Sequence, residues 1–333
     1  MRKTLIWISG VCIATAVAIF IAFQLSPWPS ALLIRKTFDD TAWRVSTALL
    51  KHVPTGISTL HNEHYDAADQ DAYLDVFFPD GISQTSQPLP TIVWTHGGGW
   101  VSGSKDQITN YAKILAGKGY TVVTVDYSIA PRVIYPVPVR QVNAALAYLV
   151  KNAARFHVDP DAFFLAGDSA GAHISSQLAN IVSEPSYAAT LNIVPSIQRS
   201  QLRGVILYCG PYDTTRVNLN GSFGGFLKTI LWAYSGDRNF TVNRQFASAS
   251  VINYVNKDFP PVFISAGNAD PLLPQSQAFA DVLSKKGVPV SSLFFPPDYS
   301  PALDHEYQFD LDGDAGKQAL DQSLKFIAEY SRH

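Results

Sequence analysis

Cysteine is scarce in this chain, with only Cys12 and Cys209 among 333 residues. Two cysteines cannot build a disulfide framework or a cysteine-based zinc site. An excess of basic charge is also absent, because 25 Lys and Arg stand against 27 Asp and Glu. This balance argues against a nucleic-acid-binding protein. Charged residues make up 16% and hydrophobic residues 47% of the chain, which excludes wholesale disorder and predicts a large core.

The longest apolar stretch lies at the N-terminus, where residues 4–34 carry no charge. Its core, residues 5–25, reads LIWISGVCIATAVAIFIAFQL and has about the length of a helix that crosses a hydrocarbon core. The stretch predicts a single transmembrane anchor over residues 5–25. A cleaved signal peptide, which would release a secreted protein, and a buried core helix are the two alternatives.

The charges around this stretch bear on its orientation. Arg2 and Lys3 precede it and favour residues 1–4 on the cytoplasmic side. Arg35 and Lys36 follow it closely and reduce the asymmetry of charge. We expect the rest of the chain on the extracytoplasmic, periplasmic side of the membrane.

Beyond this span the chain divides into two parts. Residues 26–70 are typical of a linker with an amphipathic cap helix over residues 31–52. From residue 71 onward, short apolar runs alternate with helical patterns, which predicts an α/β fold with a mainly parallel sheet and helices on both faces. The predicted strands are residues 73–78, 91–95, 121–125, 163–166, 204–208, 261–265 and 291–295. The predicted helices are residues 105–118, 137–155, 170–182, 274–286 and 316–331.

One segment, residues 211–256, interrupts the alternation with several glycines and aromatic residues. We expect it to form a small cap inserted into the domain of residues 71–333. Its aromatic side chains either pack as the core of the cap or form an apolar wall for an acyl chain. They are Phe223, Phe226, Trp232 and Tyr234.

The pentapeptide Gly167-Asp168-Ser169-Ala170-Gly171 follows an apolar strand and precedes a helical run. The pattern G-x-S-x-G in this context is typical of a nucleophile elbow, a sharp turn that projects the serine hydroxyl from the top of the sheet. The start of the following helix adds positive potential where an oxyanion would form. Ser169 is therefore the candidate nucleophile.

A second glycine motif strengthens this interpretation. The predicted strand of residues 91–95 runs into His96-Gly97-Gly98-Gly99-Trp100. Consecutive glycines after a strand allow several backbone N–H groups to point at one position, as in an oxyanion hole. The N–H of Ala170, just after the nucleophile, would complete the hole. His96 itself is expected to brace the loop.

These motifs resemble the hormone-sensitive-lipase-like family of α/β-hydrolases, with its H-G-G-G and G-D-S-A-G sequences. The resemblance extends over about residues 70–330 and implies the α/β-hydrolase fold. It also implies that Gly98 and Gly99 supply the oxyanion-hole N–H groups. The segment Asp126-Tyr127-Ser128-Ile129-Ala130-Pro131 is similar to the D-Y-R-L-A-P stretch of that family. Ser128 replaces its arginine, and Arg132 stands where an acid is common.

The catalytic triad of such a fold follows the chain order serine, acid, histidine. Asp270 lies just after the predicted strand of residues 261–265, in a D-P-L sequence similar to that of the family. Asp298 and Asp304 are the competing acids. We expect Asp270 to be the triad acid.

Two histidines follow Asp270 in the chain, namely His305 and His333. His333 is the last residue, where chain ends commonly fray. His305 lies after the predicted strand of residues 291–295 and is the candidate base. The family commonly has His-Gly-Phe at this place, whereas this chain has His305-Glu306-Tyr307.

An early cluster contains His61 and His64 together with Glu63 and Asp66. A metal site is one interpretation, but the spacing is poor and no further ligand converges there. We therefore expect a solvated loop.

Together these features predict a serine carboxylesterase that hydrolyses short- to medium-chain esters through an acyl-enzyme. No cofactor or metal is required, the partner is a small ester, and no nucleic acid is expected. An amide hydrolase of the arylformamidase type and a catalytically silent, membrane-anchored binding protein are the alternatives. The oligomeric state, the physiological ester and its acyl-chain length are not determined by the sequence.

Overall fold

The computed structural model describes residues 2–82, 87–217, 219–221 and 223–331. Its centre is an eight-stranded sheet in the order β1-β2-β4-β3-β5-β6-β7-β8. The pairs β1–β2 and β2–β4 are antiparallel, and all pairs from β4 to β8 are parallel. The strands are β1 Ile57–His64, β2 Tyr73–Pro79, β3 Leu89–Thr95, β4 Thr121–Val125, β5 Val158–Asp168, β6 Leu202–Tyr208, β7 Val262–Ala266 and β8 Val290–Phe294.

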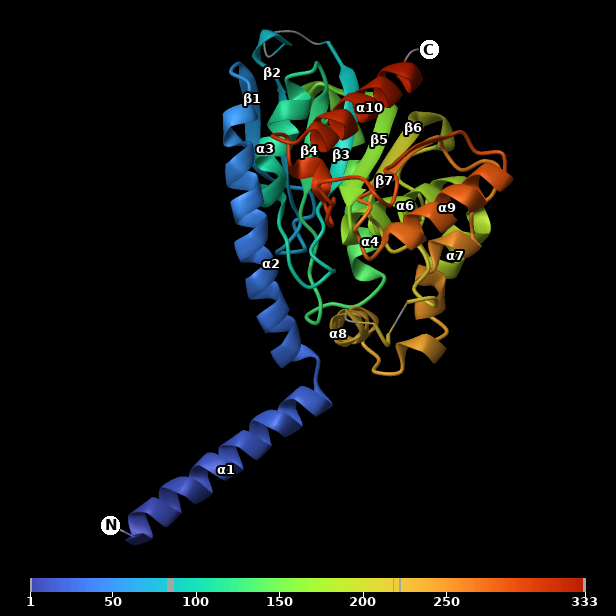
Figure 1. Cartoon of the computed structure of the whole chain (residues 1–333). Coiled ribbons are helices and arrows are strands. Elements are labelled where there is room, and N and C mark those ends of the chain that lie inside the picture. Colours follow the sequence, from blue (N-terminus) through green and yellow to red (C-terminus); the bar gives the residue numbers. More distant parts are fainter. Residues whose placement is uncertain (1, 83–86, 218, 222, 332–333) are drawn as a thin grey trace.

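Helices cover both faces of this sheet (Figure 1). Side chains of successive strand residues point to opposite faces, so Val93 packs in one core cluster and Trp94 in the other. Helices α4, α6 and α9 pack on the Val93 face, and α3 and α10 pack on the Trp94 face. The helices are α1 Arg2–Leu25, α2 Trp28–Ala48, α3 Lys105–Ala116, α4 Val137–Lys151, α5 Ala153–Phe156, α6 Ala170–Ser183, α7 Pro185–Leu191, α8 Gly224–Ser235, α9 Leu273–Lys285 and α10 Asp314–Tyr330.

The seven predicted strands correspond to β2–β8 and the five predicted helical stretches to α3, α4 with α5, α6, α9 and α10. The prediction was wrong for residues 57–64. They form β1 at the sheet edge, and neither a linker nor a solvated loop. His61 and His64 therefore lie on a strand, where His61 Nδ1 is 2.9 Å from Asp75 Oδ2 and His64 Nε2 is 2.8 Å from the Asp69 carbonyl. The ring nitrogens have protein partners, and no metal cluster forms there among the described residues.

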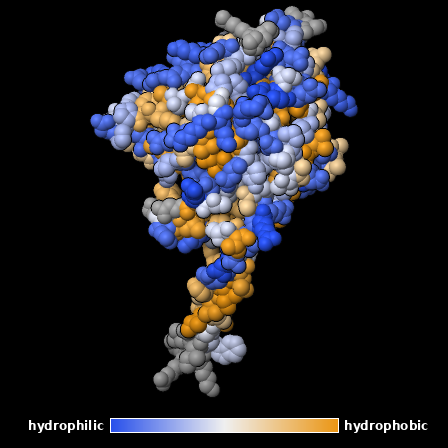
Figure 2. All heavy atoms as spheres, turned by 90° about the vertical axis from the view of Figure 1, so that its right-hand side faces the viewer, coloured by the Kyte–Doolittle hydropathy of each residue, from blue (hydrophilic) through white to orange (hydrophobic). Residues whose placement is uncertain are grey.

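The N-terminal apolar stretch forms α1, which projects away from the rest of the molecule (Figure 1). Figure 2 shows apolar side chains gathered along α1, and the side chains of Ile13, Phe20 and Leu25 are exposed. Among the described residues, no helix taken singly has the length and apolar character to cross a membrane. The segment Gly10–Leu25 meets those requirements only together with Trp28–His52, to which it is inclined by 83°.

Helix α2 follows α1 and lies alongside the sheet, in contact with α3 and α8 (Figure 1). Residues 211–256, between β6 and β7, include α8 and three short 3-10 helices. Helices α2 and α8 both contribute side chains to the cavity at the carboxyl ends of the strands. Ligand sites in parallel α/β sheets gather at this edge.

Candidate active site

The predicted nucleophile elbow is a tight turn between β5 and α6. Strand β5 ends at Asp168 and α6 begins at Ala170, so Ser169 is the single residue between them. Ser169 has φ 50° and ψ −117°, which is an uncommon conformation for a residue with a side chain. Such strain is characteristic of functional turns. The turn places Ser169 in the lining of a large cavity.

The elbow requires glycine where α6 crosses the end of β3. A Cβ atom on Gly171 would lie 1.9 Å from the Thr95 carbonyl oxygen. Because β3 ends at Thr95, this close approach brings the first turn of α6 against the start of the His96–Trp100 loop. The G-x-S-x-G spacing thus positions the oxyanion loop as well as the serine.

The oxyanion loop turns sharply at its glycines. Gly98 has φ 98°, and a Cβ atom there would lie 2.3 Å from the Ser102 carbonyl oxygen. The Gly98 carbonyl accepts hydrogen bonds from the N–H groups of Val101 and Ser102. In the described part of the chain, no hydrogen bond occupies the N–H groups of Gly98, Gly99 or Ala170. All three residues line the same cavity as Ser169.

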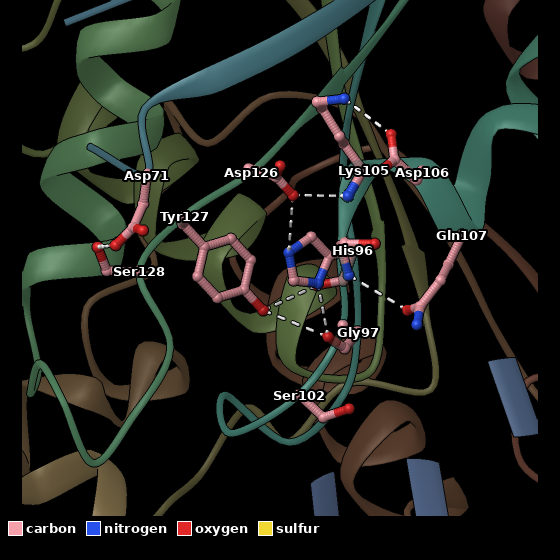
Figure 3. Close-up of polar contacts among 12 residues, drawn as sticks. Asp71, His96, Gly97, Ser102, Lys105, Asp106, Gln107, Asp126, Tyr127 and Ser128 are labelled. Carbon is pink, nitrogen blue, oxygen red and sulfur yellow. Dashed lines mark hydrogen bonds and ion pairs between the residues drawn. The ribbon is translucent and has the colours of Figure 1, made fainter. Parts of the chain in front are cut away.

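Buried polar contacts hold this loop (Figure 3). The Tyr127 hydroxyl donates to the His96 carbonyl at 3.0 Å, and the two rings stack 4.2 Å apart. His96 Nδ1 lies 2.9 Å from the Gly97 carbonyl, while Nε2 lies 3.9 Å from Asp126 Oδ1. Burial lowers the pKa of His96 to about 4, so its imidazole is neutral at pH 7. These contacts agree with a bracing role for His96.

The two departures from the family pattern in the following loop share one partner. Ser128 and Arg132 both contact the Asp71 carboxylate. Ser128 stands where the family has an arginine, and Arg132 forms an ion pair with Asp71. This ion pair connects the loop to the residues just before β2.

Asp270 and His305 form a direct pair. His305 Nδ1 lies 2.9 Å from Asp270 Oδ2, and Asp270 Oδ1 accepts a hydrogen bond from the Leu272 N–H. Asp270 is 4% exposed, whereas the side chain of His305 is one-third exposed and lines the cavity. The competing acids Asp298 and Asp304 are exposed, and no hydrogen bond joins either to His305 among the described residues. His333 lies outside the described residues.

The surroundings of His305 favour its protonated form. Burial opposes the charge, but the hydrogen-bonding contacts of the imidazole with Cys209 and Asp270 outweigh it and raise the pKa of the imidazole well above its ordinary value. Nε2, the nitrogen that would face a substrate, lies 3.8 Å from Glu306 Oε1. The described structure contains no hydrogen bond between Ser169 and His305. Apo structures commonly leave such contacts long.

Cys209, Asp270 and His305 are close enough to share a metal ion, since one ligand atom from each lies within 4.8 Å of the others. However, burial raises the pKa of Cys209 to about 12, so its thiol stays protonated at neutral pH. Asp270 and His305 are already hydrogen-bonded to each other. This group therefore suits a carboxylate that orients the imidazole better than a metal site.

The cavity beside Ser169 has a volume of about 930 Å³. Its polar end holds the serine, the histidine and the oxyanion loop, with Asp270 buried behind the histidine. Much of its remaining wall is apolar, with contributions from α2, α8, the segment before α8 and the start of α9. The apolar residues include Phe38, Val45, Phe223, Phe226, Leu227 and Ile230.

The aromatic residues of the predicted cap therefore divide between the two expected roles. Phe223 and Phe226 line the cavity. Tyr234 is buried and stacks on Trp100 with ring centroids 4.6 Å apart, and Trp232 packs under Arg238.

Sequence reasoning missed two groups at the polar end, Asp168 and Glu306. The available signal was the departure from His-Gly-Phe, because it places a carboxyl group directly after the candidate base. Phe38 on α2 was also missed, since its place in the wall depends on how α2 packs against α8.

Comparison with known proteins places these features in a family. The BD-FAE family model matches residues 74–285, more than half of the chain. The chain is 28% identical over 246 residues to the esterase LipQ of Mycobacterium tuberculosis, which covers 72% of this chain and 56% of that protein. It is 30% identical over 197 residues to the esterase LipC of the same organism, which covers 58% and 47% respectively. The chain thus spans about half the length of these curated relatives.

Solved structures share the architecture. Esterase B from Lactobacillus rhamnosis superposes with a TM-score of 0.77 at 23% identity, covering 91% of this chain and 96% of that one. An esterase from Pyrobaculum calidifontis gives a TM-score of 0.71 at 19% identity and covers 95% and 96%. At these identities the comparison establishes the α/β-hydrolase fold.

Proposed function

We propose that the chain, which belongs to the BD-FAE family, is a serine carboxylesterase. The family match and the esterase relatives confirm the resemblance to hormone-sensitive-lipase-like α/β-hydrolases that the motifs indicate. The observation that carries the proposal is that the required groups share one cavity. A strained serine, a histidine paired with a buried carboxylate and three N–H groups without partners in the described chain all line it.

In the proposed mechanism, His305 takes the proton of Ser169 as its hydroxyl attacks the ester carbonyl. Asp270 holds the imidazole through Nδ1 and stabilises the imidazolium. The N–H groups of Gly98, Gly99 and Ala170 donate to the developing oxyanion. The proton on Nε2 then passes to the leaving alcohol, and water hydrolyses the acyl-enzyme by the same route.

The shape of the cavity supports short- to medium-chain carboxylic esters as substrates. Its apolar wall suits a hydrocarbon chain, and its volume lies in the range of small-molecule sites. One related solved structure, of Lactobacillus rhamnosis esterase B, is described as inhibited by a tributyrin phosphonate. Because tributyrin carries four-carbon acyl groups, this inhibitor supports short acyl groups as candidate substrates of this chain.

Hydrolysis of p-nitrophenyl esters from acetyl to palmitoyl tests the proposal, with Ser169→Ala measured beside the wild type. We expect turnover that peaks at a short or medium chain and falls by about 10³-fold or more in Ser169→Ala. Turnover unchanged in the variant would remove Ser169 from the mechanism. A formamide hydrolysed faster than every ester would favour an amide hydrolase, and a folded protein without any turnover would favour a binding role.

We also propose that α1 anchors the chain in a membrane, with the hydrolase domain on the extracytoplasmic side. Support comes from the uncharged sequence of residues 4–34 and from the exposed apolar side chains of α1. We expect the full chain to stay with the membrane pellet after alkaline carbonate washing. Release into the supernatant at full length would contradict anchoring, and release of a shortened chain would indicate signal cleavage.

A further inference from the structure

A second carboxyl group lies beside the candidate base, in addition to Asp270. Glu306 directly follows His305, and its Oε1 is 3.8 Å from His305 Nε2. Its backbone has φ 63°, in the left-handed region that glycine adopts most easily. A glutamate held at such a position costs backbone strain, and strained residues that the surrounding structure holds in place cluster at functional sites.

Glu306 meets Asp168, the residue before the nucleophile. Asp168 is 2% exposed, and its Oδ1 accepts a hydrogen bond from Trp94 Nε1 at 2.8 Å. A Cβ atom placed on Gly97 would lie 2.2 Å from Asp168 Oδ2 and 2.9 Å from Glu306 Oε1. The two carboxyl oxygens therefore converge on one point above Gly97, in space that only a glycine leaves free.

Two carboxylates this close cannot both carry charge in a buried site. Burial and the neighbouring Glu306 raise the pKa of Asp168 well above its ordinary value. Because Asp168 is the more buried of the two carboxyl groups, we assign the proton of the pair to Asp168. Its Oδ1 accepts from Trp94, which leaves Oδ2 to donate toward Glu306. Glu306 is one-third exposed and is therefore the member of the pair that remains in contact with solvent.

We propose that Glu306 is a positioning residue of the active site, a second carboxylate that is held by protonated Asp168 and stabilises the imidazolium form of His305. This inference rests on the proposed esterase mechanism. Glu306 takes no proton itself: the proton moves from the Ser169 hydroxyl to His305 Nε2 and then to the leaving alcohol. During that interval the imidazolium lies between Asp270 on its Nδ1 side and Glu306 on its Nε2 side.

The titratable groups around His305 come from four places in the fold. Asp270 follows β7, Cys209 follows β6, Asp168 ends β5, and Glu306 lies in the loop of His305 itself. The Cys209 thiol is neutral at pH 7, as is protonated Asp168. Asp270 and Glu306 are therefore the two negative charges that act on the imidazole.

The test compares Glu306→Gln with Asp298→Asn in the full chain in detergent. Both changes remove one negative charge from the segment between β8 and α10, but Asp298 is exposed and does not line the cavity. In Glu306→Gln we expect the acid limb of the kcat/KM profile to move down by about one pH unit and kcat at the optimum to fall about tenfold. KM should stay within about twofold, and Asp298→Asn should behave as wild type.

A second pair of variants tests the shared proton. Asparagine at position 168 can accept from Trp94 and donate to Glu306, as a protonated aspartate does, so Asp168→Asn should keep the wild-type pH profile. Asp168→Ala removes the donor and should shift the profile toward that of Glu306→Gln. Thermal unfolding of each variant shows whether the fold is kept. A folded Asp168→Asn with its profile displaced would overturn the proton assignment.

The low-field imidazole N–H resonance of His305, followed by proton NMR against pH, separates this inference from the esterase proposal. We expect its midpoint to fall in Glu306→Gln and to stay unchanged in Asp298→Asn. Equal midpoints in Glu306→Gln and wild type would overturn the role of Glu306, even if esters are hydrolysed. If the midpoint shifts in a chain that hydrolyses no ester, the contact between Glu306 and His305 would be supported. Only the esterase proposal would then be contradicted.

Discussion

The molecule contains two histidine–aspartate pairs with the same geometry at opposite parts of the sheet. His305 Nδ1 lies 2.9 Å from Asp270 Oδ2, and His61 Nδ1 lies 2.9 Å from Asp75 Oδ2. Both carboxylate side chains are fully buried, and both histidines are partly exposed. Distance and burial alone therefore do not distinguish a triad from a structural pair.

The surroundings distinguish them. Asp75 also bonds Lys105 Nζ at 2.9 Å and the Asn62 N–H at 2.7 Å. Burial would raise the pKa of Asp75, but these contacts and His61 together lower it. Its charge is thus balanced by a lysine, and no serine elbow is nearby. Asp270 has no basic partner except His305 among the described residues, so its charge acts on the imidazole beside the nucleophile.

The largest expected difference between the pairs is in activity. Asp270→Asn should lower kcat by about 10³- to 10⁴-fold without unfolding the protein, because the imidazole loses the charge that orients and stabilises it. Ester turnover and a thermal melt measure the two effects. Asp298→Asn and Asp304→Asn, at the competing acids, should retain activity. If Asp304→Asn were the inactive variant, the acid would be misassigned.

The second difference is in stability. Lys105→Met should lower the free energy of unfolding by about 3–5 kcal/mol, because it leaves Asp75 buried without its cation. Chemical denaturation measures this loss. The control is Lys118→Met, which removes an exposed lysine just after α3 and should change stability by less than about 0.5 kcal/mol. Similar losses in both variants would show that Asp75 does not depend on Lys105.

The pH dependence of activity should report His305. Its raised pKa means that the imidazole keeps its proton to a higher pH than an ordinary histidine, while catalysis needs the neutral base. Activity should therefore fall on acidification with a midpoint above about 6.5, at about tenfold per pH unit below it. A kcat/KM profile of wild type between pH 4 and 10 checks this. A flat profile down to pH 4 would be inconsistent with a histidine base.

The smallest effect is expected at the other histidine. His61→Gln removes a half-exposed partner from Asp75 but leaves Lys105 and the Asn62 N–H in place. Stability should fall by less than about 1 kcal/mol, and ester turnover should stay at the wild-type level. The same melts and assays apply. Loss of turnover with an unchanged melt would mean that the β1 edge takes part in catalysis.

Several elements of the site were predictable because each is encoded by neighbouring residues. The G-D-S-A-G turn depends on the local conformation of Ser169 and on the missing side chain of Gly171. The oxyanion loop depends on consecutive glycines, and a strand such as β4, TVVTV, is a short run of β-branched residues. Strand β1 was missed since its sequence ISTLHNEH is polar, as suits a partly exposed edge strand with a register shift between Leu60 and Glu63.

The sequence by itself determined the alternation of strands and helices, the serine elbow, the glycine loop and the order Ser169, Asp270, His305. These follow from backbone conformation and apolar periodicity, which act over a few residues. Only the tertiary structure decided that His61 pairs with Asp75 as closely as His305 pairs with Asp270, and that Asp168 and Glu306 meet above Gly97. Those facts depend on chain packing, because burial and charge at each group are set by what the fold brings next to it.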